Sequence, residues 1–208
     1  IDPPGIHTVF EYFLILLEFH HDLWRRGGGM GVEGPLISAI VIPTHDSAVA
    51  ETYKILRRLR NGLVPLVDGD LDGNMKVEEL RTVAEPPNLV LQWRDAWAIE
   101  DTIGWVLKAS AGDALADLQD RIGQEFDDID ALVALFKQNK GPKRLKGDYL
   151  AYEEVASVIR NQAGCRKRAA MLLKAVTSAC IGRYDESALL HRDNSKSSEQ
   201  RVVLRLSP

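Results

Sequence analysis

A short apolar run that ends in three regularly spaced carboxylates constrains this chain more than any other feature. The run Leu63-Val64-Pro65-Leu66-Val67 is followed directly by Asp68-Gly69-Asp70-Leu71-Asp72-Gly73-Asn74. Apolar runs of this length, bounded by turn residues, predict a buried strand. Carboxylates gathered where a strand ends suit the hard cations Mg²⁺ and Ca²⁺, which prefer oxygen ligands. The segment therefore predicts a cation site at the end of a strand.

One interpretation of these letters is the calcium loop of an EF-hand. Residues 68–79 match its pattern, D-x-[DN]-x-[DN]-G-x5-E, at every specified position. An EF-hand also requires a helix that runs into its first aspartate. Asn61-Gly62 would stop such a helix, and Pro65 disfavours helical backbone in the residue before it. The flanks thus favour a strand, and a non-enzymatic Ca²⁺-binding module stays open as the alternative.

Strands and helices alternate through the central part of the chain. The pattern predicts strands over 37–42, 63–67 and 88–93, and helices over 48–60, 75–84 and 97–107. Such alternation implies parallel strands in a doubly wound α/β sheet. Ligands of these sheets bind outside the carboxyl ends of the strands, where Asp68 and Asp70 lie. Glu100 follows the next strand, so we expect it at the same rim.

The second half of the chain has a mainly helical pattern. It predicts helices over 111–122, 125–138, 148–161 and 165–181, with a basic loop over 140–147. We expect residues 184–208, which are polar, to form a frayed tail. The predicted organisation is an N-terminal segment without a readable pattern over 1–31, an α/β domain over 32–110, a helical extension over 111–183 and the tail.

Composition excludes several classes of protein. Hydrophobic residues make up 45% and charged residues 27%, which is ordinary for a globular protein. The sequence contains no apolar run that could span a bilayer, no signal-peptide pattern and no phosphate-loop motif. We therefore expect a cytoplasmic protein without a membrane partner. Cys165 and Cys180 occur in helical patterns, which predicts packing rather than a disulfide framework.

Charge is distributed unevenly along the chain. Residues 68–130 carry 16 acidic and five basic side chains, whereas residues 137–183 carry 11 basic and three acidic ones. Solvated helix faces account for such runs in most proteins. Beside a predicted cation site, the pattern also indicates an acidic metal-binding region and a basic surface suited to a phosphate backbone.

Residues 37–107 resemble the Toprim domain of OLD-family (overcoming lysogenization defect) nucleases. The matching pieces are the strand and turn over 64–70, Gly73, and the helix start Trp97-Ala98-Ile99-Glu100-Asp101. Residues 146–153 resemble a later helical segment, in which such proteins carry a lysine near the metal site. The family usually has an ABC-type ATPase domain ahead of Toprim, so this chain would correspond to the C-terminal nuclease part.

The resemblance implies a Rossmann-like Toprim fold and a Mg²⁺-dependent or Mn²⁺-dependent DNA endonuclease with two-metal chemistry. Its metal ligands would be Asp68, Asp70, Glu100 and Glu33, with Glu33 also acting in catalysis. Lys146 would neutralise charge on the phosphate in the transition state. The implied partners are DNA, the ATPase domain of the same system and a second copy of the chain.

Glu33 is where the sequence departs from the Toprim pattern. Glu33-Gly34 matches the family's Glu-Gly in letters, but the strand predicted from Ile37 leaves no room for the intervening helix. Either the domain is shortened or the match is accidental. In the second case the chain lacks a metal ligand or base. A degenerate Toprim domain that serves only in DNA binding or dimerisation is a further alternative.

Overall fold

The computed structural model describes residues 48–207 of the chain. The N-terminal segment over 1–31, Glu33 and the strand predicted over 37–42 lie outside the described residues. The described residues, 48–207, divide into two compact units. One unit contains residues 48–103 and 174–207, and the other contains residues 104–173.

The first unit is an α/β structure built on a four-stranded, mostly parallel sheet. The strands are β1 (Leu66–Val67), β2 (Leu89–Trp93), β3 (Leu190–Arg192) and β4 (Val202–Leu206), in the order β1-β2-β4-β3. β1, β2 and β4 are parallel, and β3 runs antiparallel to β4. The expected α/β class with parallel strands is therefore confirmed.

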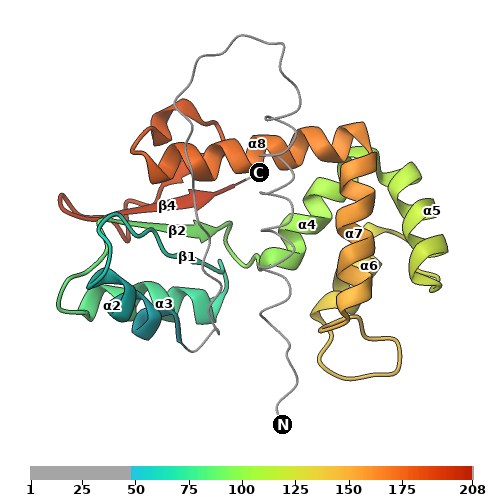
Figure 1. Ribbon diagram of the computed structural model, residues 1–208, viewed down its shortest axis with the longest axis horizontal. Helices are drawn as coiled ribbons and strands as arrows, with labels where there is room; N and C mark the ends of the chain where they lie inside the picture. Colours follow the sequence, from blue (N-terminus) through green and yellow to red (C-terminus); the bar gives the residue numbers. More distant parts are fainter. Residues whose placement is uncertain (1–47, 208) are drawn as a thin grey trace. The chain divides into compact units, whose positions relative to one another are not determined.

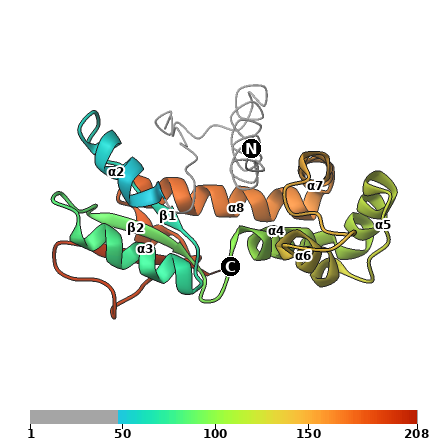
Figure 2. The same cartoon turned by 90° about the horizontal axis from the view of Figure 1, so that it is seen from below.

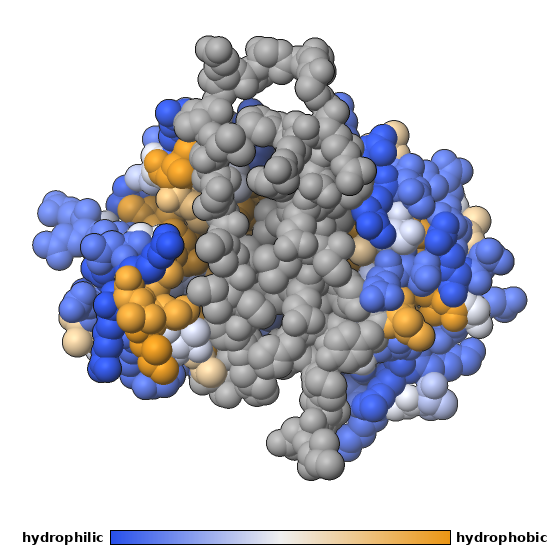
Figure 3. Space-filling view, viewed as in Figure 1, coloured by the Kyte–Doolittle hydropathy of each residue, from blue (hydrophilic) through white to orange (hydrophobic). Residues whose placement is uncertain are grey.

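Helices lie on both sides of this sheet (Figures 1 and 2). α2 (Val49–Arg57) and α3 (Leu71–Thr82) cover one face, and the last turns of α8 (Ala163–Cys180) lie on the other. The core of the α2–α3 side joins buried side chains from both helices and three strands, namely Ala50, Tyr53, Val67, Val77, Leu80, Val83, Val90 and Val203. This layer also leaves apolar side chains on the surface (Figure 3), among them Ile55 of α2 and Leu59, which follows that helix.

The segment after β1 is a tight turn into a helix and not a calcium loop. A strand precedes Asp68, and α3 begins at Leu71 instead of the expected residue 75. Asp70 is the N-cap of this helix, and its side chain accepts a hydrogen bond from the Gly73 N–H at 2.8 Å. Most of residues 68–79 are therefore helical. The EF-hand alternative is wrong, because its loop would have to occupy the same residues.

The C-terminal residues are part of the sheet, which corrects the expected frayed tail and the expected domain boundary. β4 pairs with β2 along its whole length, from Leu89 beside Val202 to Trp93 beside Leu206. It lies between β2 and β3, so its backbone is hydrogen-bonded on both edges. Val202-Val203-Leu204-Arg205-Leu206 is rich in strand-forming residues. The α/β unit is thus completed by the end of the chain.

The second unit is helical, as predicted. The helices that contribute to it are the end of α4 (Ile99–Leu107), α5 (Ala111–Ile122), α6 (Ile129–Lys137), α7 (Tyr149–Asn161) and the start of α8. α6 begins later than expected because the Asp128 side chain caps it, accepting from the Ala131 N–H at 2.7 Å. Within residues 48–207, no helix has the length and apolar character to cross a membrane.

Candidate functional site

The acidic turn lies at the carboxyl end of the sheet. β1 and β2 are parallel, with Val67 level with Gln92, so the chain leaves both strands at the same rim. Two backbone hydrogen bonds then join the segments beyond them. The Gly69 N–H donates to the carbonyl of Trp97 at 2.7 Å, and the Ala96 N–H donates to the carbonyl of Gly69 at 2.9 Å. The turn after β1 is therefore held against the segment that follows β2.

Both glycines of the turn are required by close backbone contacts. A Cβ at position 69 would lie 1.8 Å from the carbonyl oxygen of Arg94, and a Cβ at position 73 would lie 1.9 Å from that of Asp68. No side chain fits at either distance. Backbone packing thus requires glycine at both positions of the pattern D-G-D-L-D-G, whether or not an ion is bound.

A strained residue occurs at the same rim. Ala96 has a φ of 62°, in the left-handed region that residues other than glycine rarely adopt. Within residues 48–207 it is the one non-glycine residue with a positive φ. Backbone strain of this kind is concentrated at functional sites in proteins. It supports the carboxyl rim as the candidate site, together with the position of the acidic turn.

The carboxylates at the rim have different surroundings. Asp68 is half-buried, and Asp70 is engaged as the cap of α3. Glu100 is only 9% exposed, in the first turn of α4. Its neighbour Asp101 accepts a hydrogen bond from the Ala98 N–H at 2.7 Å and so stabilises the start of that helix. At least two acidic groups therefore have a role in capping helices.

These carboxylates do not form a metal centre among the described residues. Residues 48–207 contain no group of three or more His, Cys, Asp or Glu side chains that could hold a metal ion. The expected convergence of Asp68, Asp70 and Glu100 on one cation is therefore not found. Glu33, the fourth expected ligand, lies outside the described residues. The described part of the chain does not by itself fit the Mg²⁺ or Mn²⁺ site that the Toprim resemblance implies.

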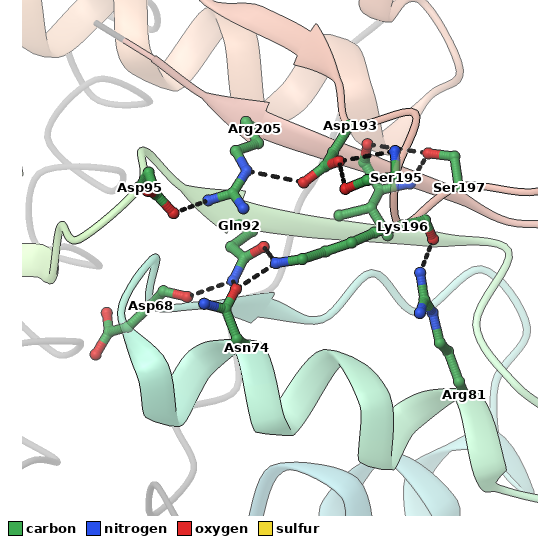
Figure 4. A network of polar contacts seen from close by, with 11 residues as sticks. Asp68, Asn74, Arg81, Gln92, Asp95, Asp193, Ser195, Lys196, Ser197 and Arg205 are labelled. Carbon is green, nitrogen blue, oxygen red and sulfur yellow. Dashed lines mark hydrogen bonds and ion pairs between the residues drawn. The ribbon is translucent and has the colours of Figure 1, made fainter.

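A buried glutamine connects the acidic turn to the rest of the unit (Figure 4). Gln92 lies on β2 and is completely buried. Its Nε2 donates to the backbone carbonyl of Asp68 at 2.9 Å and to Oδ1 of Asn74 at 2.9 Å. Its Oε1 accepts from Nζ of Lys196 at 3.1 Å. All the polar groups of this side-chain amide are thus engaged, as burial requires.

Lys196 reaches this amide from the loop between β3 and β4. Its Nζ also donates to Oδ1 of Asn74, and its backbone carbonyl accepts from the Arg81 guanidinium. Desolvation and the nearby charge of Arg205 lower the pKa of Lys196. The loop is therefore attached to α3 and to β2 by polar contacts.

Asp193 of the same loop belongs to an ion-pair network that is centred on Arg205 of β4. Nε of Arg205 donates to Oδ2 of Asp193 at 3.0 Å, and Nη1 of the same guanidinium lies 3.2 Å from Oδ1 of Asp95 (Figure 4). Burial acts to raise the pKa of Asp193, but hydrogen bonds from Ser195 and Arg205 and the charge of Arg205 outweigh it. The pKa of Asp193 is consequently below its usual value.

Sequence reasoning did not single out Gln92, Asn74 or Lys196. One local signal was available, since Gln92 is the polar residue within the buried strand Leu89-Val90-Leu91-Gln92-Trp93. A polar side chain at such a position requires hydrogen-bond partners. The partners themselves come from distant parts of the chain and left no local pattern.

The helical unit carries a fixed basic loop between α6 and α7. The Leu145 side chain is buried, and its N–H donates to the carbonyl of Leu135 at 3.0 Å. Lys140 and Lys143 are exposed and Lys146 is half-buried. None of these three ammonium groups has an ion pair with another described residue. The loop is anchored by one apolar side chain and presents positive charge that no described residue pairs. The expected catalytic role of Lys146 stays a prediction.

Known proteins give no independent guide to this site. Neither protein-family models, nor curated proteins, nor solved structures include a match for this chain. The resemblance to Toprim domains therefore depends on the residues of the acidic turn, the start of α4 and the segment around Lys146.

Proposed function

We propose that this chain is a Toprim-like module of a metal-dependent DNA endonuclease, with Asp68 as the central acidic residue of its site. The observation that carries the proposal is the position of Asp68-Gly69-Asp70 directly after a parallel strand. Glu100 comes from the helix that follows the neighbouring strand. Phosphodiester hydrolysis by such proteins uses divalent metal ions held by carboxylates. Because Asp68, Asp70 and Glu100 do not by themselves form such a site, Glu33 would have to contribute to it.

The basic loop supports DNA as the partner. Lys140, Lys143 and Lys146 are cations without ion-pair partners among the described residues, on a loop that is fixed by the buried Leu145. Lysines of this kind bind phosphates as point charges and release condensed counterions from the nucleic acid. Such contacts would supply affinity without sequence preference.

Nicking of supercoiled plasmid in Mg²⁺ or Mn²⁺ tests the proposal. We expect cleavage by the parent chain and a loss of about a hundredfold or more in Asp68→Ala, because a ligand carboxylate is removed. Asp72→Ala is the matched control, since Asp72 is an exposed carboxylate nearby, in the first turn of α3. Equal cleavage by the parent and Asp68→Ala would contradict the assignment.

A second candidate is a degenerate Toprim-like domain that binds DNA without cleaving it. The lack of a three-carboxylate group among the described residues favours it, as does the use of Asp70 as a helix cap. Under this proposal the parent shows no nicking in either metal but retards DNA in a gel. The plasmid experiment and a binding assay together distinguish the two candidates.

A further inference from the structure

The direction in which the Gln92 amide points is determined by its neighbours. An ammonium group has only hydrogen-bond donors, so the side-chain atom that faces Lys196 must be the oxygen. The nitrogen then faces the backbone carbonyl of Asp68, which can only accept. If the amide were reversed, two oxygens would meet at Asp68 and two donors would meet at Lys196. The charge of Lys196 therefore selects the orientation that binds the acidic turn.

Asn74 reinforces this arrangement from α3. Its Oδ1 accepts from both Nε2 of Gln92 and Nζ of Lys196. A single oxygen is thus shared by the two donors, which fixes the Asn74 amide as well. The carbonyl of Asp68 and the first turns of α3 are held by one connected set of hydrogen bonds.

Lys196 is itself held firmly by its loop. Its N–H donates to the carbonyl of Asp193 at 3.2 Å, and the Asp193 N–H donates to the carbonyl of Val203 on β4 at 2.9 Å. The Arg81 guanidinium binds the carbonyl of Lys196 from α3. The ammonium group is therefore presented to Gln92 by a loop that is fixed at both the sheet and the helix.

We infer that Lys196 is a positioning residue for the acidic turn, acting through Gln92 and Asn74 on the backbone of Asp68. The inference deepens the proposed function, and its consequence for metal binding rests on that function. The C-terminal loop would thereby determine whether the rim carboxylates are correctly placed. Figure 4 shows the chain of contacts from Lys196 to Asp68.

Amide hydrogen exchange tests the positioning step without any metal. We expect Lys196→Met to speed exchange at Gly69 and Gly73 by about tenfold, the effect of losing about one hydrogen bond. Exchange at Leu91, whose N–H donates to the carbonyl of Pro65 at 2.8 Å, should stay unchanged and report intact strand pairing. Lys196→Arg keeps a donor-only cation and should restore slow exchange.

The matched control is Lys76→Met. Lys76 lies on the same helix as Asn74 and pairs with Glu79 at 2.9 Å, outside the network. If Lys196→Met does not fold, Lys196→Gln serves instead, because an amide has both donors and acceptors and no longer selects one orientation. Exchange at Gly69 and Gly73 that matches the control in these variants would overturn the inference.

Titration with Mn²⁺ alone separates this inference from the proposed function. If the parent binds Mn²⁺, we expect about tenfold weaker binding in Lys196→Met and unchanged binding in Lys76→Met. Unchanged affinity in Lys196→Met would overturn the inference and leave the metal site standing. If the parent binds no Mn²⁺, the proposed function fails, and the exchange rates still decide whether Lys196 positions the turn.

Discussion

The side-chain amide of Gln92 donates a 2.9 Å hydrogen bond to the backbone carbonyl of Asp68. Gln92 is on β2 and Asp68 is the first residue after β1, so this bond joins the ends of two parallel strands. A completely buried amide at this position stabilises the fold only if all its hydrogen bonds are made. The bond also fixes the backbone from which the acidic side chains project.

The first prediction concerns the close backbone contact at Gly69. We expect Gly69→Ala to destabilise the α/β unit by about 3 kcal/mol or more, because its Cβ would overlap the carbonyl oxygen of Arg94. Gly112→Ala is the control, since a Cβ there meets no atom within 4 Å and alanine is the better helix former. Urea-induced unfolding measures the free energy of unfolding of both variants. Equal stability of the two variants would contradict the backbone packing described for the turn.

The second prediction follows from the lowered pKa of Asp193. A carboxyl group whose pKa is lower in the folded state adds stability at pH values above its unfolded-state pKa, about 3.9. That stability is lost as the pH falls through the folded-state pKa. We expect Asp193→Asn to be less stable than the parent by on the order of 1 kcal/mol at neutral pH. The difference should shrink in acid, and an equal difference at neutral and acidic pH would contradict the ion pair.

Local sequence patterns were sufficient to predict the elements that precede the carboxyl rim. Gly62 and Pro65 favoured a strand over a helix before Asp68, and a short strand, Leu66–Val67, is present there. The start of α3 was placed too late, because Asp72, Gly73 and Asn74 have low helix propensity and read as a loop. The cap formed by Asp70 overrides that propensity. A cap of this kind depends on backbone geometry that the letters do not specify.

Contacts between distant segments could not be predicted in the same way. The strand β4 pairs with β2 in the sheet. It was not predicted, because the polar residues that precede it made the C-terminal segment resemble a frayed tail in composition. The contact between Lys196 and Gln92 spans 104 residues of sequence. Neither interaction leaves a periodic signal within a short window of sequence. The core of the α/β unit was thus predictable in outline, and the polar network under the acidic turn was not.

The third prediction concerns the basic loop. Replacing Lys140, Lys143 and Lys146 together by Gln should weaken DNA binding to a similar extent for unrelated sequences. The salt dependence of the binding constant should also fall, by about 0.9 in the log–log slope for each phosphate that the loop no longer neutralises. Filter binding over a series of salt concentrations measures both effects.

The control for the basic loop removes cations that already have partners. Lys54 pairs with Glu51 at 3.0 Å, and Lys108 pairs with Asp130 at 2.6 Å. Replacing these two lysines by Gln should change the salt slope much less than the loop replacement does. A loop variant that keeps the parent slope would show that the loop does not bind phosphate.

Paramagnetic broadening by Mn²⁺ tests the central claim, that the acidic turn belongs to a metal site, most directly. Bound Mn²⁺ broadens the amide resonances of residues close to it in a two-dimensional NMR spectrum. The account predicts that substoichiometric Mn²⁺ broadens Asp68, Gly69, Asp70 and Glu100 first, and that Asp68→Ala removes this selectivity. Broadening that is uniform, or that is centred on Asp127, Asp128 and Asp130, would contradict a metal site at the carboxyl rim.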